Sequence, residues 1–190
     1  ENVTVSGDAY VMTAGTLEGT VDSTAFSQTG GDASTATVNS DYRVTAIGGT
    51  IAENGPGGID AENDNGGITI VTTADGDIDN DAPVATGAGI RAATTGAGHA
   101  ISMTLGGSVR GDTAGIVAST DAAQGTSGVT IDFADDVTGE NGHGIAVTSG
   151  GAVAVHNTGG SGVTVQGGGS GNAGVSVQTS LTDGLGIHLY

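Results

Sequence analysis

Several residue types that define common protein classes are missing from this sequence. Its 190 residues include no cysteine and no tryptophan, and aromatic residues make up only 3%. The absence of cysteine excludes disulfides and thiolate metal sites. With so few aromatic side chains, a buried core has to be built from Val, Ile, Leu and Ala, which suits thin and regular packing layers.

Basic residues are nearly absent as well. Three arginines and no lysine face 21 carboxylates, so the net charge is -18. Such a surface repels nucleic acid and anionic membranes, and we expect neither partner. No apolar run approaches the roughly 20 residues of a membrane-spanning helix, so membrane insertion is not expected either. The sequence begins with ENVTV, without Met or a signal segment, and we interpret the chain as a mature or trimmed product.

A helical period is also missing, whereas a period of two recurs throughout. The chain contains 38 glycines and 2 prolines, and glycine every few residues weakens a helix. Short segments place aliphatic residues on alternate positions, which is typical of strands with one buried face. These segments are ITI (68–70), ISMTL (101–105), VTIDF (129–133), VAV (153–155), VTV (163–165) and GIHL (186–189).

The sequence also repeats over a longer distance than this alternation. A glycine followed by Ile or Val recurs at regular distances, with Ile59, Ile90, Ile116, Ile145 and Val175 as the apolar members. The intervals between them are 31, 26, 29 and 30 residues. Each of these anchors is followed by a second strand, and most by a third, shorter one. Three short strands in a repeat of about 30 residues describe one coil of a β-solenoid. The sequence therefore predicts an all-β, right-handed parallel β-helix of about six coils, each 26–31 residues long.

The first 50 residues fit this pattern less well. They are polar and irregular, with strand fragments at 35–38 and 42–47 but no clean anchor. We therefore divide the chain into degenerate N-terminal coils or a cap at 1–48, and regular β-helix coils at 49–190.

The alternation also predicts which side chains are inside. Glycine is expected to supply positive-φ corners and to let stacked backbones approach, while Thr, Ser, Asn and Asp face water. The residues expected to be buried and stacked from coil to coil are Ile59, Ile68, Ile70, Ile78, Ile90, Ile101, Met103, Val109, Ile116, Val129, Ile131, Val137, Ile145, Val153, Val155, Val163, Val165 and Val175.

The Gly-rich coils resemble a known class of proteins. The segments GAGIRAATTGAGHAISM (87–103), TAGIVAST (113–120) and GHGIAVTSGGAVAVHN (142–157) carry the resemblance, which spans roughly 49–190. They are similar to the passenger region of bacterial autotransporters and related large secreted adhesins. The resemblance implies an extracellular or cell-surface rod used in adhesion, aggregation or a biofilm matrix. The resemblance does not extend to a C-terminal membrane barrel, and we expect any translocation unit to lie outside these residues or not to exist.

Two acidic segments contain candidate calcium ligands. Asp75, Asp77, Asp79 and Asp81 alternate along the chain, as do Asp60, Glu62 and Asp64. Calcium loops use acidic residues at such spacing, but they need a tight turn to bring the oxygens together. Alternate side chains of an extended strand lie about 6.6 Å apart, too far for one ion without bending. The alternative is a solvated acidic face without a cofactor.

The anchor spacing also assigns neighbours to the arginines. Aligning Ile59 with Ile90 places Asp60 beside Arg91 in the next coil. Aligning Ile78 with Val109 places Asp77 and Asp79 beside Ser108 and Arg110, with Asp136 one coil further along. Opposite charges at these positions would interrupt a ladder of like charges.

No catalytic motif is present. The histidines, His99, His143, His156 and His188, do not have metal-ligand spacing, and His143 is expected to cap or solvate the turn 140–144. Polysaccharide lyases with a β-helix fold need carboxylates together with basic residues, and basic residues are scarce here. We therefore expect no enzyme.

Three functions are compatible with the pattern. The first is a structural or adhesive module of a bacterial surface fibre or passenger, acting as a rod or spacer against a host or matrix surface. The second is an extracellular filament subunit that polymerises head to tail through the end strands 1–15 and 181–190. The third, least supported, is a glycan-active β-helix enzyme.

Overall fold

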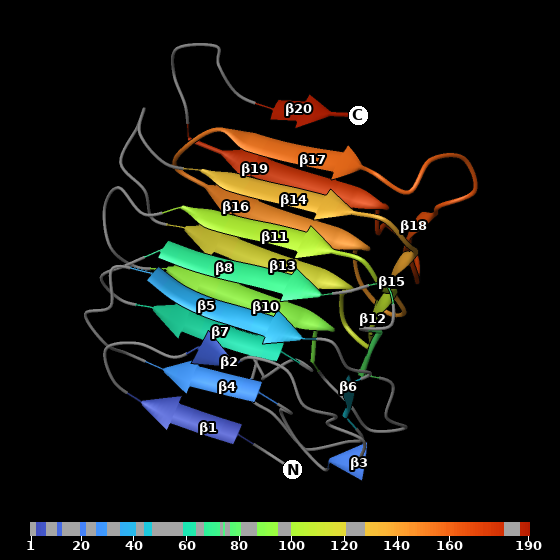
Figure 1. Cartoon of the computed structure of the whole chain (residues 1–190). Coiled ribbons are helices and arrows are strands. Elements are labelled where there is room, and N and C mark those ends of the chain that lie inside the picture. Colours follow the sequence, from blue (N-terminus) through green and yellow to red (C-terminus); the bar gives the residue numbers. More distant parts are fainter. Residues whose placement is uncertain are drawn as a thin grey trace.

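The computed structural model describes the residues 3–6, 11–12, 20–21, 26–29, 35–40, 44–46, 59–63, 67–72, 74, 77–80, 87–94, 100–120, 128–180 and 187–190. Within these residues the chain contains strands and no helix, and all strand pairs are parallel. The strands form three sheets that run the length of the molecule, with β1 near one end and β20 at the other (Figure 1). The parallel β-helix expected from the sequence is confirmed.

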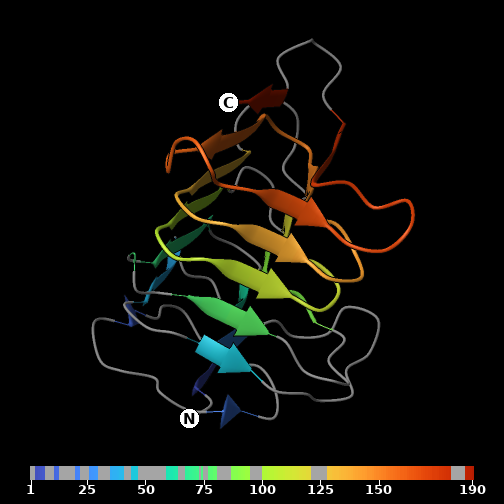
Figure 2. The same ribbon diagram turned by 90° about the vertical axis from the view of Figure 1, so that its right-hand side faces the viewer.

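Every third strand belongs to the same sheet, as the stacked arrows show in two views (Figures 1 and 2). Sheet A contains β1 (Val3–Ser6), β4 (Phe26–Thr29), β7 (Ile59–Asn63), β10 (Ile90–Thr94), β13 (Ile116–Thr120), β16 (Ile145–Ser149) and β19 (Val175–Thr179). Sheet B contains β2 (Val11–Met12), β5 (Thr35–Ser40), β8 (Gly67–Thr72), β11 (Ile101–Leu105), β14 (Val129–Phe133), β17 (Val153–Asn157) and β20 (Ile187–Leu189). Sheet C contains β3 (Thr20–Val21), β6 (Val44–Ala46), β9 (Ile78–Asn80), β12 (Val109–Gly111), β15 (Val137–Gly139) and β18 (Val165–Gly167).

The chain visits the sheets in the order A, B, C, so each coil contributes one strand to each sheet. The described strands between Val3 and Ala46 join the same three sheets as the later strands. The register follows the predicted anchors, because Ile59 pairs with Ile90, Ile90 with Ile116, Ile116 with Ile145, and Ile145 with Val175.

The interior is a continuous column of aliphatic side chains. All residues of the predicted core from Ile59 to Val155 are buried. Val163, Val165 and Val175, in contrast, are only partly buried and pack against the edge of the core. They belong to the last coil, where β18 and β19 are the end strands of sheets C and A and have a neighbour on one side only.

The expectation that threonine and serine face water is wrong at Thr72 in sheet B, and at one column of positions in sheet A. Thr94, Thr120 and Ser149, the last residues of three sheet A strands, are buried and lie in register with one another. The Thr94 hydroxyl donates to Thr120 Oγ1 at 3.0 Å. These residues occupy the fifth strand position, which has the same inward parity as the first and third. A hydroxyl can enter the core there because it finds a partner: Thr94 binds Thr120 of the next coil, and Ser149 Oγ accepts the Gly151 N–H of its own coil.

Glycine at the coil corners serves mainly close approach. The described glycines with positive φ are Gly160, Gly162, Gly169 and Gly171, all in the loops of the last complete coil. The expected positive-φ corners are therefore confined to these loops, and the anchor glycines act differently. A Cβ added to Gly144, for example, would lie 2.7 Å from the Gly174 carbonyl oxygen of the next coil. Only glycine lets the two backbones stack at this distance.

Candidate functional site

The acidic segment at 74–83 lies at the entry to sheet C. Asp75 and Asp81 lie outside the described residues, and of Asp79 only the backbone position is described. Asp77 lies one residue before β9, and its Oδ1 accepts hydrogen bonds from the backbone N–H and the hydroxyl of Ser108, both at 2.8 Å. This carboxylate oxygen therefore binds the next coil. Calcium at Asp75, Asp77, Asp79 and Asp81 stays a prediction.

Asp136 repeats the arrangement two coils further along the rod. It precedes β15 as Asp77 precedes β9, and its Oδ1 accepts the Thr164 N–H at 2.7 Å. The backbone carbonyl of Asp136 accepts the Val109 N–H at 2.9 Å, which confirms that Asp136 lies beside the coil of Ser108. An aspartate at this position thus satisfies a backbone donor where the chain turns into sheet C.

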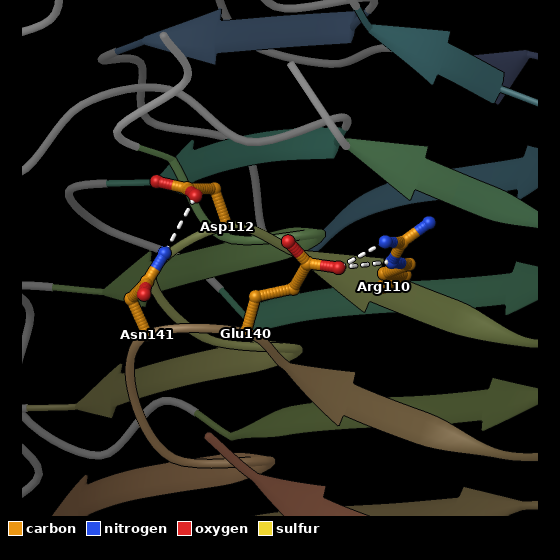
Figure 3. Close-up of polar contacts among 4 residues, drawn as sticks. All are labelled: Arg110, Asp112, Glu140 and Asn141. Atoms are coloured by element: carbon orange, nitrogen blue, oxygen red, sulfur yellow. Dashed lines mark hydrogen bonds and ion pairs between the residues drawn. The ribbon is translucent and has the colours of Figure 1, made fainter. Parts of the chain in front are cut away.

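Both arginine registers that the anchors predict are confirmed at the backbone. Arg91 pairs with Asp60, and Arg110 pairs with Asp79. The Arg110 side chain also reaches into the coil on its other side, where Nε donates to Glu140 Oε1 at 2.7 Å and Nη2 forms an ion pair with the same oxygen (Figure 3). Sequence reasoning did not identify Glu140, because it lies in the turn after β15 and outside the aligned strand positions.

A second link joins the same two turns. The Asn141 amide donates to Asp112 Oδ1 at 2.8 Å, beside the Arg110–Glu140 pair (Figure 3). One coil further along, the Asn172 amide donates to the carbonyl oxygen of Asn141 at 3.0 Å. Side chains at the corner from sheet C to sheet A thus connect three successive turns.

The histidines have structural partners. The Ala173 N–H donates to His143 Nδ1 at 2.9 Å, so His143 caps a backbone donor, but in the turn of the next coil and not in its own turn. His156 Nδ1 lies 2.7 Å from Asp132 Oδ1, and its ring packs on Tyr190 with the centroids 4.8 Å apart. His188 Nδ1 lies 3.1 Å from the Tyr190 hydroxyl. His99 lies outside the described residues.

The His156 cluster escaped sequence reasoning. The sequence feature that indicates this cluster is the register of β14 with β17, in which Asp132 is paired with His156. Aligning Val129 with Val153 would have revealed that pair.

These groups do not converge on a reaction centre. Among the described residues, no group of three or more His, Cys, Asp or Glu side chains is arranged to hold a metal ion. The hydrogen bonds of Asp77, Asp136, Arg110 and Asn141 each join one coil to the next. The polar surface therefore supplies links between neighbouring coils.

Comparisons with known proteins give no further assignment. The part of the chain that the structure describes contains no helix long and apolar enough to cross a membrane. No protein-family model, no curated protein and no solved structure matches the chain.

Proposed function

We propose that this chain is a structural module of a bacterial extracellular fibre or autotransporter-type passenger, in which it acts as a rod or spacer. The observation that carries the proposal is that polar side chains form hydrogen bonds and ion pairs with the neighbouring coil. The charged and amide side chains described above bind the neighbouring coil, and the aliphatic core is uninterrupted from Ile59 to Val155. Contacts of this kind hold neighbouring coils together, and a rod that acts as a spacer requires its coils to remain stacked.

The length of the rod follows from the stacking distance. Neighbouring strands lie about 4.8 Å apart, so the seven strands of sheet A span roughly 30 Å along the axis. A spacer built in this way can be lengthened by whole coils without any change in its cross-section, because each coil contacts only its neighbours.

An inserted coil tests the proposal. A second copy of residues 116–144, placed after Gly144, preserves the anchor spacing and adds one strand to each sheet. X-ray scattering should then show a monomer about 4.8 Å longer, with the melting temperature retained. A control insertion of the same residues, with the copy of Ile131 replaced by Asp, places an unpaired charge in the core of the added coil and should destabilise the rod. Loss of folding in the in-register insertion would contradict a modular rod, and hydrolysis or cleavage of any member of a polysaccharide panel would favour the enzyme.

A filament subunit is the second candidate, favoured by the apolar surface of the last coil. Ile187 is 46% exposed and Leu189 is 58% exposed on β20, which has one partner strand, β17. This strand can pair with chain that follows it in a longer protein or with the end coil of another copy. Of the proposed contact segments 1–15 and 181–190, the structure describes Val3–Ser6, Val11–Met12 and 187–190.

Sedimentation of the purified chain distinguishes these outcomes. A filament subunit should sediment as a concentration-dependent series of species, and deletion of 182–190 should return it to a monomer. A monomer at high concentration, with 182–190 present, would reject head-to-tail assembly and leave the spacer.

A further inference from the structure

A polar groove lies on the outside of the rod where sheet A passes into sheet B. Its volume is about 470 Å³, and it extends across three successive coils. The residues that line it are Thr120, Thr148, Ser149, Gly150, Gln178, Thr179 and Ser180. None of them takes part in the contacts between coils at the corner from sheet C to sheet A, so the groove is separate from those links.

A short connection between β16 and β17 forms the floor of the groove. Three residues, 150–152, join β16 to β17, whereas eight follow β13 and seven follow β19 before the next strand begins. A short connection stays close to the core, and Gly150 and Gly151 are in fact buried. The Gly150 N–H donates to the Thr120 carbonyl at 3.2 Å, and the Gly151 N–H donates to Ser149 Oγ at 3.0 Å. These two hydrogen bonds therefore fix the backbone at the floor of the groove without a ligand.

Two side chains on its wall are available to a ligand. Thr148 and Gln178 are paired in register on β16 and β19, and both are exposed. Neither side chain forms a hydrogen bond with a described residue. A hydroxyl both donates and accepts, and a carboxamide offers two N–H donors and one acceptor oxygen. Together they present donors and acceptors side by side.

The composition of the lining limits the chemistry of the ligand. The seven lining residues, all within the part of the chain that the structure describes, include no charged and no aromatic side chain. An anionic ligand would be repelled by a chain of net charge -18, while a cation finds carboxylates elsewhere on the surface but none in the groove. A lipid or a flat aromatic ligand needs large apolar side chains, and the described lining residues, which are Thr, Ser, Gly and Gln, include none. Hydroxyl groups of a neutral sugar, in contrast, complement hydroxyl and amide walls.

We propose that this groove binds a neutral oligosaccharide. Its volume falls within the range of about 300–1,000 Å³ that is typical of small-ligand sites. Ser119, Thr148 and Gln178 are register neighbours about 4.8 Å apart in successive coils, so a linear ligand can meet a hydroxyl or an amide group in each of them. This inference goes beyond the spacer role and does not depend on it.

Calorimetric titration of the intact chain with three neutral probes, maltohexaose, cellohexaose and mannohexaose, tests the proposal. At least one should bind, and the double variant Thr148→Ala/Gln178→Ala should weaken that binding at least tenfold. The matched control is Thr104→Ala/Gln166→Ala, which removes the same side-chain types from exposed positions on sheets B and C. The control should bind within twofold of the parent chain.

Three results would overturn the proposal: no binding of any neutral probe, equal weakening in both double variants, or tighter binding of hexagalacturonate, an acidic probe. If the groove variant fails to fold, amide shifts in the NMR spectrum of the parent chain decide the question. Shifts concentrated at Thr148, Gln178 and Ser180 on addition of the probe support the groove, and shifts elsewhere refute it.

Discussion

Replacement of Ile131 by alanine should cost the rod a large part of its stability. Ile131 is the central residue of β14, it is fully buried, and its register neighbours in the adjoining coils are Met103 and Val155. Both neighbours are themselves buried, so the coils cannot easily close over the missing atoms. Ile→Ala substitutions at such sites cost about 2–5 kcal/mol, because the lost transfer free energy adds to a cavity term.

The adjacent residue provides the matched control. Thr130 lies on the same strand with the opposite parity and is partly exposed. Its replacement by alanine should change the free energy of unfolding by no more than about 0.5 kcal/mol. For a chain of this length, a cost of about 3 kcal/mol corresponds to a fall of roughly 6–12 °C in melting temperature. Ile131→Asp should be more damaging still, since it buries an unpaired charge.

The assay combines urea denaturation with hydrogen exchange. Stability in a solenoid is distributed over neighbouring coils, so exchange in Ile131→Ala should accelerate first in β11, β14 and β17. Two results would refute the reasoning. If Ile131→Ala unfolds at the same urea concentration as the parent chain, the core column is not closely packed. If Thr130→Ala is the more damaging change, the strand faces the other way, as a slip of one residue would produce.

Three other predictions concern the glycines, the ion pair and calcium. Gly139→Ala should destabilise the corner after β15 by more than about 1 kcal/mol in urea denaturation, because the new Cβ would lie 2.1 Å from the His143 carbonyl oxygen; an unchanged midpoint would show that the corner can shift. A double-mutant cycle of Arg110→Gln with Glu140→Gln should give a coupling of about 0.2–1 kcal/mol that falls with salt, since the two side chains are 42% and 31% exposed; a larger, salt-independent coupling would contradict a solvent-screened pair. Millimolar calcium should raise the melting temperature only slightly. A large rise that is lost in Asp77→Asn/Asp79→Asn would instead establish a calcium site.

Strand positions and register could be predicted from the sequence alone. The alternation of aliphatic residues determines which face of each strand is inside, because side chains of a strand point to opposite faces in turn. The Gly-Ile anchors then determine which residues stack, as the pairs Ile59–Ile90 and Asp79–Arg110 illustrate. Both signals are local, since a coil contacts only its neighbours and each coil carries its own anchor, which sets its register against the coil before it.

Contacts at the corners were decided only by the tertiary structure. Arg110 reaches Glu140 because the turn after β15 places that carboxylate beside the strand, and no strand alignment contains this turn. The groove beside Thr148 likewise depends on the path of the short connection 150–152, whose Gly150 forms part of its floor. The alternation determines the direction of a side chain relative to the sheet, but the path of the backbone between strands determines what that side chain meets. Sequence therefore specified the stack of coils, and the three-dimensional course of the turns decided the surface that a ligand or partner encounters.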